Sequence, residues 1–265
     1  MFQNVFLKTL HDQRRGLVGW SAGVVLLVFV EAAIWPSIRD MSGLEDFFAE
    51  YPEGLGKLFN IEAMTTGIGF MNAELFSLLL PTLFIIYGVG RGARLVAGEE
   101  EAGTLDLLLV TPVSGAKLLI QKALALFLCL ATLGGVLFGV TVVSSMTFDL
   151  GIGAGAAVTG ALAMVLLGVE YGALALALGA ISGRRTVAIA LATVGAVAAY
   201  VLYAAGMLVP SVGPWQQLSP FHQALTGGPL GADLSPAYLW MVAATLVMVL
   251  GAAPVLDRRD IAAHG

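Results

Sequence analysis

Six long runs of apolar residues, separated by shorter polar stretches, recur along the chain. They cover residues 17–37, 72–92, 123–143, 154–181, 186–209 and 237–256, and the third, fifth and sixth contain no charged residue. A helix needs about 20 mostly apolar residues to cross the hydrocarbon core of a bilayer, and each run is that long. The pattern therefore predicts an all-α membrane protein with six transmembrane helices in one domain, residues 1–265.

The N-terminal stretch, residues 1–16, has apolar side chains on one helical face and charged side chains elsewhere on the wheel. The apolar positions are Phe2, Val5, Phe6 and Leu10, and the charged positions are Lys8, Asp12 and Arg15. This spacing is typical of an amphipathic helix that lies in the membrane interface. We expect such a helix before the chain turns into the bilayer. The alternative is an ordinary soluble N-terminal turn.

Two longer polar stretches separate spans on the same side of the membrane. Residues 38–71 are acidic with interleaved leucine and aromatic side chains, and Pro52 divides them into two short helical stretches. Residues 210–236 contain five prolines and the phrase LSPFHQALTGGPL. We expect the first loop to rest on the membrane surface or cap the spans. The second should form an irregular, folded plug, because proline interrupts regular helices.

Composition excludes a soluble protein. Hydrophobic residues make up 58% of the chain and charged residues 12%, against about 25% charged in an average soluble domain. A soluble chain of this size could not bury so much apolar surface. Cys129 is the only cysteine, which excludes an internal disulfide framework and a cysteine-based metal site.

Lysine and arginine set the orientation. If the N-terminus is cytoplasmic, eleven of the 13 Lys and Arg residues lie on the cytoplasmic side, and only Arg39 and Lys57 face out. This asymmetry follows the positive-inside rule and places both termini in the cytoplasm. The first span lacks a cleavage site of the signal-peptide type. We therefore expect a multi-pass protein of a bacterial inner membrane.

One cytoplasmic segment, residues 98–114, combines acidic and strongly apolar positions. Three glutamates precede Thr104, which can cap a short apolar helix that Thr111-Pro112 ends, and Ser114 can cap the next helix. An apolar helix on this side must bury itself against lipid, the spans or another protein. Anionic lipid would repel the glutamates, so we expect a protein partner.

The same segment carries a resemblance to a known family. GEEEAGTLDLLLVTPVSGAKLLIQK resembles the stretch after the second span of type-two ATP-binding-cassette (ABC) exporter permeases. ALALALGAISGRR, residues 173–185, is similar to the end of the family's fourth span, and LSPFHQALTGGPL, residues 218–230, to its outer loop before the last span. One departure is Gly115, where the family commonly has an arginine.

The resemblance implies a six-span permease subunit that pairs with a second permease subunit, identical or different, and docks a dimer of separate ABC ATPase subunits. The substrate would be a hydrophobic or amphiphilic drug, antibiotic or lipid, moved outward, and we expect no nucleic acid partner. The residues expected to couple this chain to the ATPase are Glu99, Glu100, Glu101, Gly103, Thr104, Leu105, Asp106 and Leu108. ATP and Mg²⁺ would be bound by the ATPase, since no G-x-x-x-x-G-K-[ST] loop occurs in this chain. The chain itself would carry no catalytic residue, cofactor or metal.

Three carboxylates lie within predicted spans, where a charge costs at least about 2.5–3.5 kcal/mol on insertion scales. Glu170 lies deepest, and Glu31 and Glu74 lie toward the outer side at similar depth. They could line a translocation path. We favour a structural role for Glu170 and snorkelling to the interface for the other two. The alternative function is a proton-coupled secondary transporter that uses Glu170, and further rivals are a membrane-embedded enzyme and a membrane sensor or immunity protein.

Several glycine patterns have simpler explanations than chemistry. GWSAG (19–23) and GVGRGA (88–93) match a hydrolase and a dinucleotide motif by chance, because neither lies in the strand–turn–helix context that those motifs need. Glycine pairs four residues apart occur at 135/139, 151/155, 168/172 and 179/183. Such pairs allow close helix packing, which we expect within the subunit.

Overall fold

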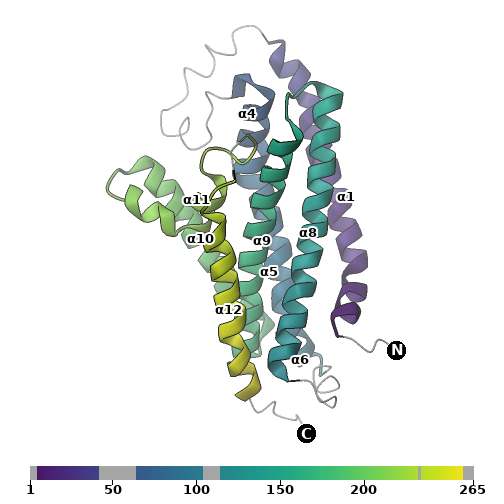
Figure 1. Ribbon diagram of the computed structural model, residues 1–265, viewed down its shortest axis with the longest axis vertical. Helices are drawn as coiled ribbons and strands as arrows, with labels where there is room; N and C mark the ends of the chain where they lie inside the picture. Colours follow the sequence, from purple (N-terminus) through teal and green to yellow (C-terminus); the bar gives the residue numbers. More distant parts are fainter. Residues whose placement is uncertain (1–4, 42–63, 104–113, 232–233, 259–265) are drawn as a thin grey trace.

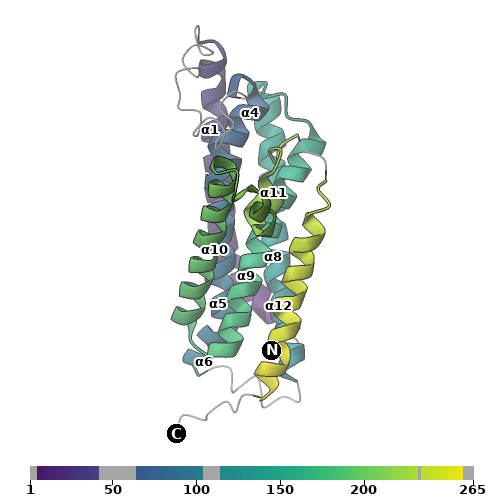
Figure 2. The ribbon, with the colours of Figure 1, turned by 90° about the vertical axis from the view of Figure 1, so that its left-hand side faces the viewer.

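The computed structural model describes residues 5–41, 64–103, 114–231 and 234–258, which form a bundle of long helices (Figures 1 and 2). Within these ranges six helices are long and apolar enough to cross a membrane, which confirms the prediction from the sequence. They are α1 (Val5–Arg39), the composite second span Gly67–Glu101, α8 (Gly115–Phe148), α9 (Ala154–Ser182), α10 (Arg185–Leu208) and α12 (Tyr238–Arg258). The parts of the chain that the structure describes contain no strand.

The first span differs from its prediction at the N-terminal side. Residues 5–16 do not form a separate surface helix followed by a turn, because α1 continues without a break from Val5 to Arg39. The only proline of α1, Pro36, lies close to its end, so nothing forces a kink earlier. At about 1.5 Å per residue the helix is about 52 Å long, well beyond the ~30 Å hydrocarbon core. Its first turns therefore extend out of the membrane along the bundle.

The second span alternates between α-helical and π-helical hydrogen bonding. Its parts are α4 (Gly67–Met71), η2 (Asn72–Leu79), α5 (Leu80–Ala93), η3 (Arg94–Gly98) and α6 (Glu99–Glu101), where η2 and η3 are π-helical. π-Helical segments are rare and are often found at functional sites. Here they occupy the two ends of the span, next to the loop clasp and the ion pair described below.

Helix α9 lies at the centre of the bundle, and α5, α8, α10 and α12 pack around it. Glycines on both helices allow α5 and α9 to pack closely. A Cβ atom on Gly88 would lie 2.1 Å from the carbonyl oxygen of Gly168, and one on Gly92 would lie 2.1 Å from that of Gly172. The 168/172 pair thus packs within the subunit, as expected. By contrast, a Cβ atom added at either glycine of the pairs 135/139 and 151/155 would meet no other atom within 4 Å.

The stretch between α10 and α12 folds back onto the bundle. It contains the 3₁₀ helix η4 (Gly213–Leu218) and the short helix α11 (Pro220–Leu225). The Asn72 side chain donates to the carbonyl oxygen of Leu230 and accepts from its N–H, both at 3.0 Å, and Thr159 donates to the Pro229 carbonyl oxygen at 2.8 Å. These bonds clasp the loop to the second and fourth spans. The two short helices predicted around Pro52 lie outside the described residues.

Candidate functional site at the basic end of the bundle

All the described Lys and Arg residues except Arg39 lie at one end of the bundle, which we call the basic end. The start of α1, the end of the second span and the end of α12 all lie there (Figure 1). Its cations are Lys8, Arg14, Arg15, Arg91, Arg94, Lys117, Lys122, Arg184, Arg185 and Arg258. Arg39, at the last turn of α1, lies at the opposite end. The arrangement is the one expected if the basic end is cytoplasmic.

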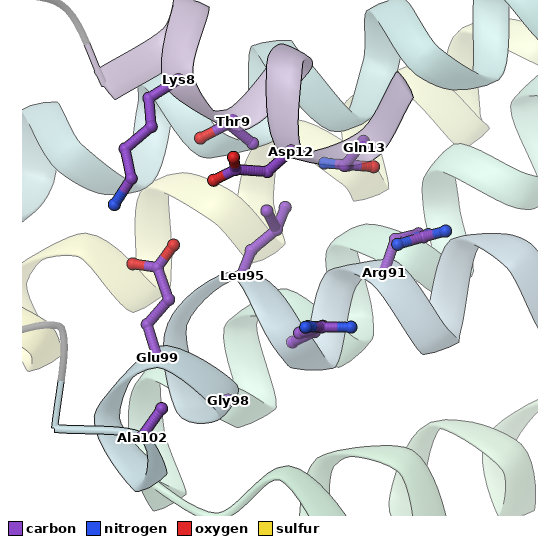
Figure 3. A pocket seen from close by; sticks show the side chains of 10 residues that line it. Lys8, Thr9, Asp12, Gln13, Arg91, Leu95, Gly98, Glu99 and Ala102 are labelled. Atoms are coloured by element: carbon purple, nitrogen blue, oxygen red, sulfur yellow. The ribbon is translucent and has the colours of Figure 1, made fainter. Parts of the chain in front are cut away.

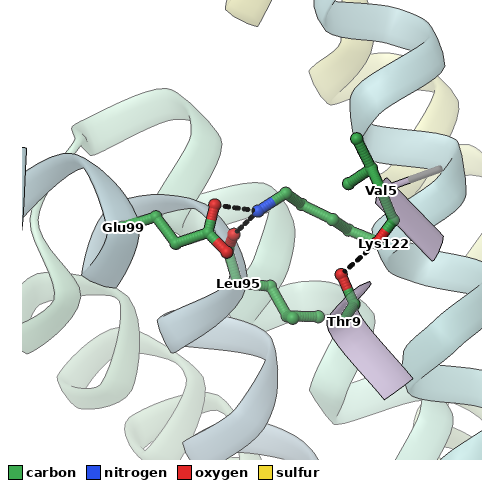
Figure 4. Close-up of polar contacts among 5 residues, drawn as sticks. All are labelled: Val5, Thr9, Leu95, Glu99 and Lys122. Carbon is green, nitrogen blue, oxygen red and sulfur yellow. Dashed lines mark hydrogen bonds and ion pairs between the residues drawn. The ribbon is translucent and has the colours of Figure 1, made fainter. Parts of the chain in front are cut away.

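A buried ion pair joins two spans at the basic end. The Lys122 side chain on α8 is 0% exposed, and its ammonium pairs with the Glu99 carboxylate and donates to the Leu95 carbonyl oxygen (Figure 4). A buried cation is tolerated only when it is paired and hydrogen-bonded. Lys122 therefore holds the start of α8 against the last turn of the second span.

The π-helical segment η3 supplies one of these acceptors. In a regular α-helix the Glu99 N–H would donate to the Leu95 carbonyl oxygen, four residues earlier. Here the Glu99 N–H donates to the Val96 carbonyl oxygen. The Leu95 carbonyl instead accepts from Lys122, so the irregular backbone and the buried cation complement each other.

Two further contacts tie helix starts to distant carboxylates. The Glu101 carboxylate accepts from the Arg185 N–H at 2.8 Å and so caps α10, which has no cap from its own Arg184 side chain. The Asp257 carboxylate accepts from the Ala116 N–H at 3.2 Å in the first turn of α8. Both anions lie at the positive end of a helix, where they are stabilising.

The start of α8 explains two features of the sequence. The Ser114 hydroxyl accepts from the Lys117 N–H at 3.3 Å, which confirms the predicted cap. A Cβ atom on Gly115 would lie 2.7 Å from the Asp257 carboxylate oxygen. A side chain at this position would have to displace Asp257, so glycine is favoured here.

The predicted coupling residues are only partly within the described chain. Glu99 and Glu101 make contacts inside the subunit, and Glu100 is half-buried. Gly103 has a φ of 64°, a left-handed conformation typical of a glycine just beyond a helix end. Thr104, Leu105, Asp106 and Leu108 lie in 104–113, outside the described residues.

A cavity of about 490 Å³ opens beside this ion pair, between the first turns of α1 and the last turns of the second span (Figure 3). Its charged and amide-bearing lining consists of Lys8, Asp12, Gln13, Arg91, Arg94 and Glu99. The basic end thus combines an ion pair, two capped helix starts and a charged cavity.

Comparison with known families decides what kind of membrane protein this is. A model of the family described as ABC-2 family transporter protein matches residues 3–226. The chain belongs to this family. No curated protein matches the sequence.

Membership of the ABC-2 transporter family makes the chain a membrane permease subunit of an ABC transporter, with several membrane-spanning helices. Subunits of this kind are generally non-catalytic, and the family in general implies an ABC ATPase partner. The resemblance seen in the sequence is therefore confirmed at the level of the family.

The three carboxylates within the spans do not form one site. Glu170 is 8% exposed in the middle of α9, and its Oε2 atom has no hydrogen-bond partner among the described residues. Glu31 and Glu74 lie close enough for their charges to interact, and Glu74 is exposed. No such interaction links Glu170 to either of them.

Sequence reasoning missed two features that matter here. Lys122 stands one residue before the predicted third span, and a lone lysine beside an apolar run was a possible signal of a buried pair. Gly88 and Gly92 belong to GVGRGA, a chance match to a dinucleotide motif. The match is unrelated to nucleotide chemistry, but its four-residue glycine spacing is the packing signal.

Proposed function

We propose that this chain is the membrane subunit of an ABC exporter that moves a hydrophobic or amphiphilic substrate outward. ATP and Mg²⁺ would be bound and ATP hydrolysed by a separate dimer of ATPase subunits. A second permease subunit would complete the path. The apolar spans, with few charges along them, favour a drug, antibiotic or lipid over a sugar or an ion.

The observation that carries the proposal is the set of contacts on both sides of the 104–113 segment. On one side, α6 is joined to α8 through Lys122 and to α10 through the Arg185 N–H. On the other side, the start of α8 is joined to α12 through Asp257. A displacement of this segment by an ATPase would therefore reach four spans without a flexible connection between them.

The surface proposed to meet the ATPase consists of two accessible residues at this end and the predicted coupling residues of the segment 104–113. These are Glu100, Gly103, Thr104, Leu105, Asp106 and Leu108. Glu99 and Glu101 would act differently from the sequence-based expectation. They would transmit movement inward, because their carboxylates already bind groups of this chain.

Site-directed cross-linking to a co-expressed candidate ABC ATPase subunit tests the proposal. Ala102→Cys, exposed at the basic end, is introduced after Cys129, which is buried, is replaced by serine. We expect Ala102→Cys to form a cross-link with the ATPase in membranes. The matched control is Leu234→Cys, which is 64% exposed at the opposite end and should form none. Cross-linking at Leu234 alone would contradict the proposed orientation and docking.

A second candidate, a proton-coupled secondary transporter, has one observation in its favour. Glu170 is buried at mid-span with a carboxylate oxygen that has no hydrogen-bond partner among the described residues. Transport in proteoliposomes separates the two functions. The exporter requires the ATPase and ATP and should tolerate Glu170→Gln, whereas the secondary transporter would run on a proton gradient alone and lose activity in that variant.

A further inference from the structure

The cavity at the basic end has an excess of positive charge. Lys8, Arg91 and Arg94 line it against two carboxylates, Asp12 and Glu99. The Glu99 carboxylate is already paired with the ammonium of Lys122. Asp12 is therefore left as the main negative charge against three cations. A volume of about 490 Å³ falls in the range of ligand-binding pockets.

A buried amide in the same cavity has no protein partner. The Gln13 side chain is 4% exposed, and neither its oxygen nor its nitrogen has a hydrogen-bond partner among the described residues. A buried polar group without a hydrogen-bond partner destabilises the folded state. Gln13 lines the cavity, so a ligand with hydrogen-bonding oxygens would remove this destabilisation.

A separate apolar groove of about 400 Å³ lies further along α1, facing α5. Its lining includes Gly19, Gly23, Leu27 and Leu83, with no charged residue. Arg91 lies between the two spaces. Its guanidinium rests on Gly16, where a Cβ atom would be 1.8 Å from Nη2. The charged cavity and the apolar groove are therefore neighbours, with Arg91 between them.

Trp20, a half-buried aromatic residue of α1, indicates the level of the membrane surface at this junction. Trp20 and Tyr87 meet edge to face with ring centroids 5.6 Å apart, and the Arg91 guanidinium lies 5.6 Å from the centre of the Tyr87 ring. Tryptophan is enriched where hydrocarbon meets headgroups, whereas Tyr87 is buried inside the bundle and packs under Trp20. The cavity lies about two to three turns of α1 closer to the basic end than Trp20, at headgroup level, and the groove lies at the level of the acyl chains.

We infer that the cavity and groove together bind one anionic phospholipid. The phosphate binds between Lys8, Arg94 and the Gln13 amide, and an acyl chain lies in the groove over Gly19 and Gly23. The bound lipid bridges the first turns of α1 and the end of the second span, next to the Glu99–Lys122 pair. The inference does not depend on the exporter function, because binding is measured on this chain alone.

Lipid titration of the purified, delipidated chain tests the headgroup cavity. Phosphatidylglycerol, phosphatidylcholine and inorganic phosphate are compared by thermal stabilisation and by native mass spectrometry. We expect stabilisation by phosphatidylglycerol that the other two do not match. Because each surface cation contributes about 1 kcal/mol toward anionic lipid, Lys8→Gln with Arg94→Gln should weaken its apparent Kd roughly 30-fold.

Matched controls separate the site from general charge attraction and from misfolding. Lys117→Gln with Arg258→Gln removes two cations at the basic end that do not line the cavity, and it should leave the affinity within about 2–3-fold of the parent. Gly19→Leu should block the acyl chain, since a Cβ there meets nothing within 4 Å and the leucine fills the groove instead. Gly135→Leu, at an equally open position on α8, should not affect binding.

Four outcomes would overturn the inference. Equal stabilisation by phosphatidylcholine would remove headgroup recognition, and an equal effect of inorganic phosphate would indicate a free-anion site. Equal losses in the test and control variants would indicate non-specific attraction. A dimer that excludes lipid would assign the groove to a second copy of the chain. Each variant is compared only if its melting temperature without lipid equals that of the parent.

Discussion

A close contact between the backbones of α5 and α9 gives the sharpest prediction. Gly88→Ala places a methyl group 2.1 Å from the Gly168 carbonyl oxygen, where ordinary contacts begin at 3.4 Å. The shortfall is 1.3 Å, and the obstacle is backbone, which cannot rotate away. Helices α5 and α9 would have to separate by about 1 Å, and a gap of that size forfeits a quarter to a half of the dispersion energy at each contact.

Two opposing terms set the size of the effect. Alanine improves helix propensity over glycine by up to about 1 kcal/mol. Overpacking against a rigid neighbour costs about 1–3 kcal/mol, and loss of the interhelical contact adds to it. We therefore expect Gly88→Ala to destabilise the protein by about 1–3 kcal/mol net.

The matched control lies in the same helix. A Cβ atom on Gly90 meets nothing within 4 Å, so Gly90→Ala should be neutral or stabilise the protein by up to ~1 kcal/mol. Gly168→Ala should fall between the two, because its nearest obstacle, at 2.7 Å, is the side-chain Cδ2 atom of Leu130 and the nearest backbone atom, the Phe84 oxygen, is 3.0 Å away. Thermal unfolding of the purified variants in detergent, followed by loss of monodisperse protein, measures the series. A Gly88→Ala variant as stable as Gly90→Ala would refute the reasoning.

Three further predictions concern the polar contacts. Lys122→Met should destabilise the protein by about 3–5 kcal/mol by leaving a carboxylate partly buried without its cation, and the swap Glu99→Lys with Lys122→Glu should recover part of the thermal stability; no recovery would mean that the pair is not the cause. Asn72→Ala should cost about 1–3 kcal/mol and make the loop before α12 more sensitive to limited proteolysis, and unchanged digestion would contradict the clasp. Burial lowers the pKa of His222 below its usual 6.5, so the folded state takes up its proton less readily than the unfolded chain. Stability should therefore be fully present above about pH 6.5 and fall as the pH drops below it. His222→Gln should flatten this dependence of the melting temperature.

The positions of the spans could be predicted closely from the sequence. The fourth, predicted at 154–181, is Ala154–Ser182, and the sixth, predicted at 237–256, is Tyr238–Arg258. Insertion into lipid depends on the hydrophobicity of each residue summed over one helix, and a lone chain in hydrocarbon must satisfy its own backbone hydrogen bonds. Both requirements concern a single helix, so they can be read from the sequence of that helix alone.

The helix ends that lie outside the membrane could be predicted less well from the sequence. Hydropathy predicted 72–92 for the second span, whereas the helix runs over Gly67–Glu101. It also suggested a turn near residue 16, which α1 does not make. Beyond the hydrocarbon core, a helix continues or stops according to its caps and packing partners rather than its hydrophobicity. The Ser114 cap was predicted because its partner lies three residues away.

By itself, the sequence determined the membrane class, the six spans, the charge asymmetry and the family resemblance, since all of these are read from neighbouring residues. Only the tertiary structure decided the partners at the basic end. Glu99 meets Lys122 across 23 positions, Glu101 meets Arg185 across 84, and Asp257 meets Ala116 across 141. The physical reason is that a transfer free energy belongs to one residue and its helix, whereas an ion pair or a cap exists only when packing brings two distant parts of the chain within a few ångströms.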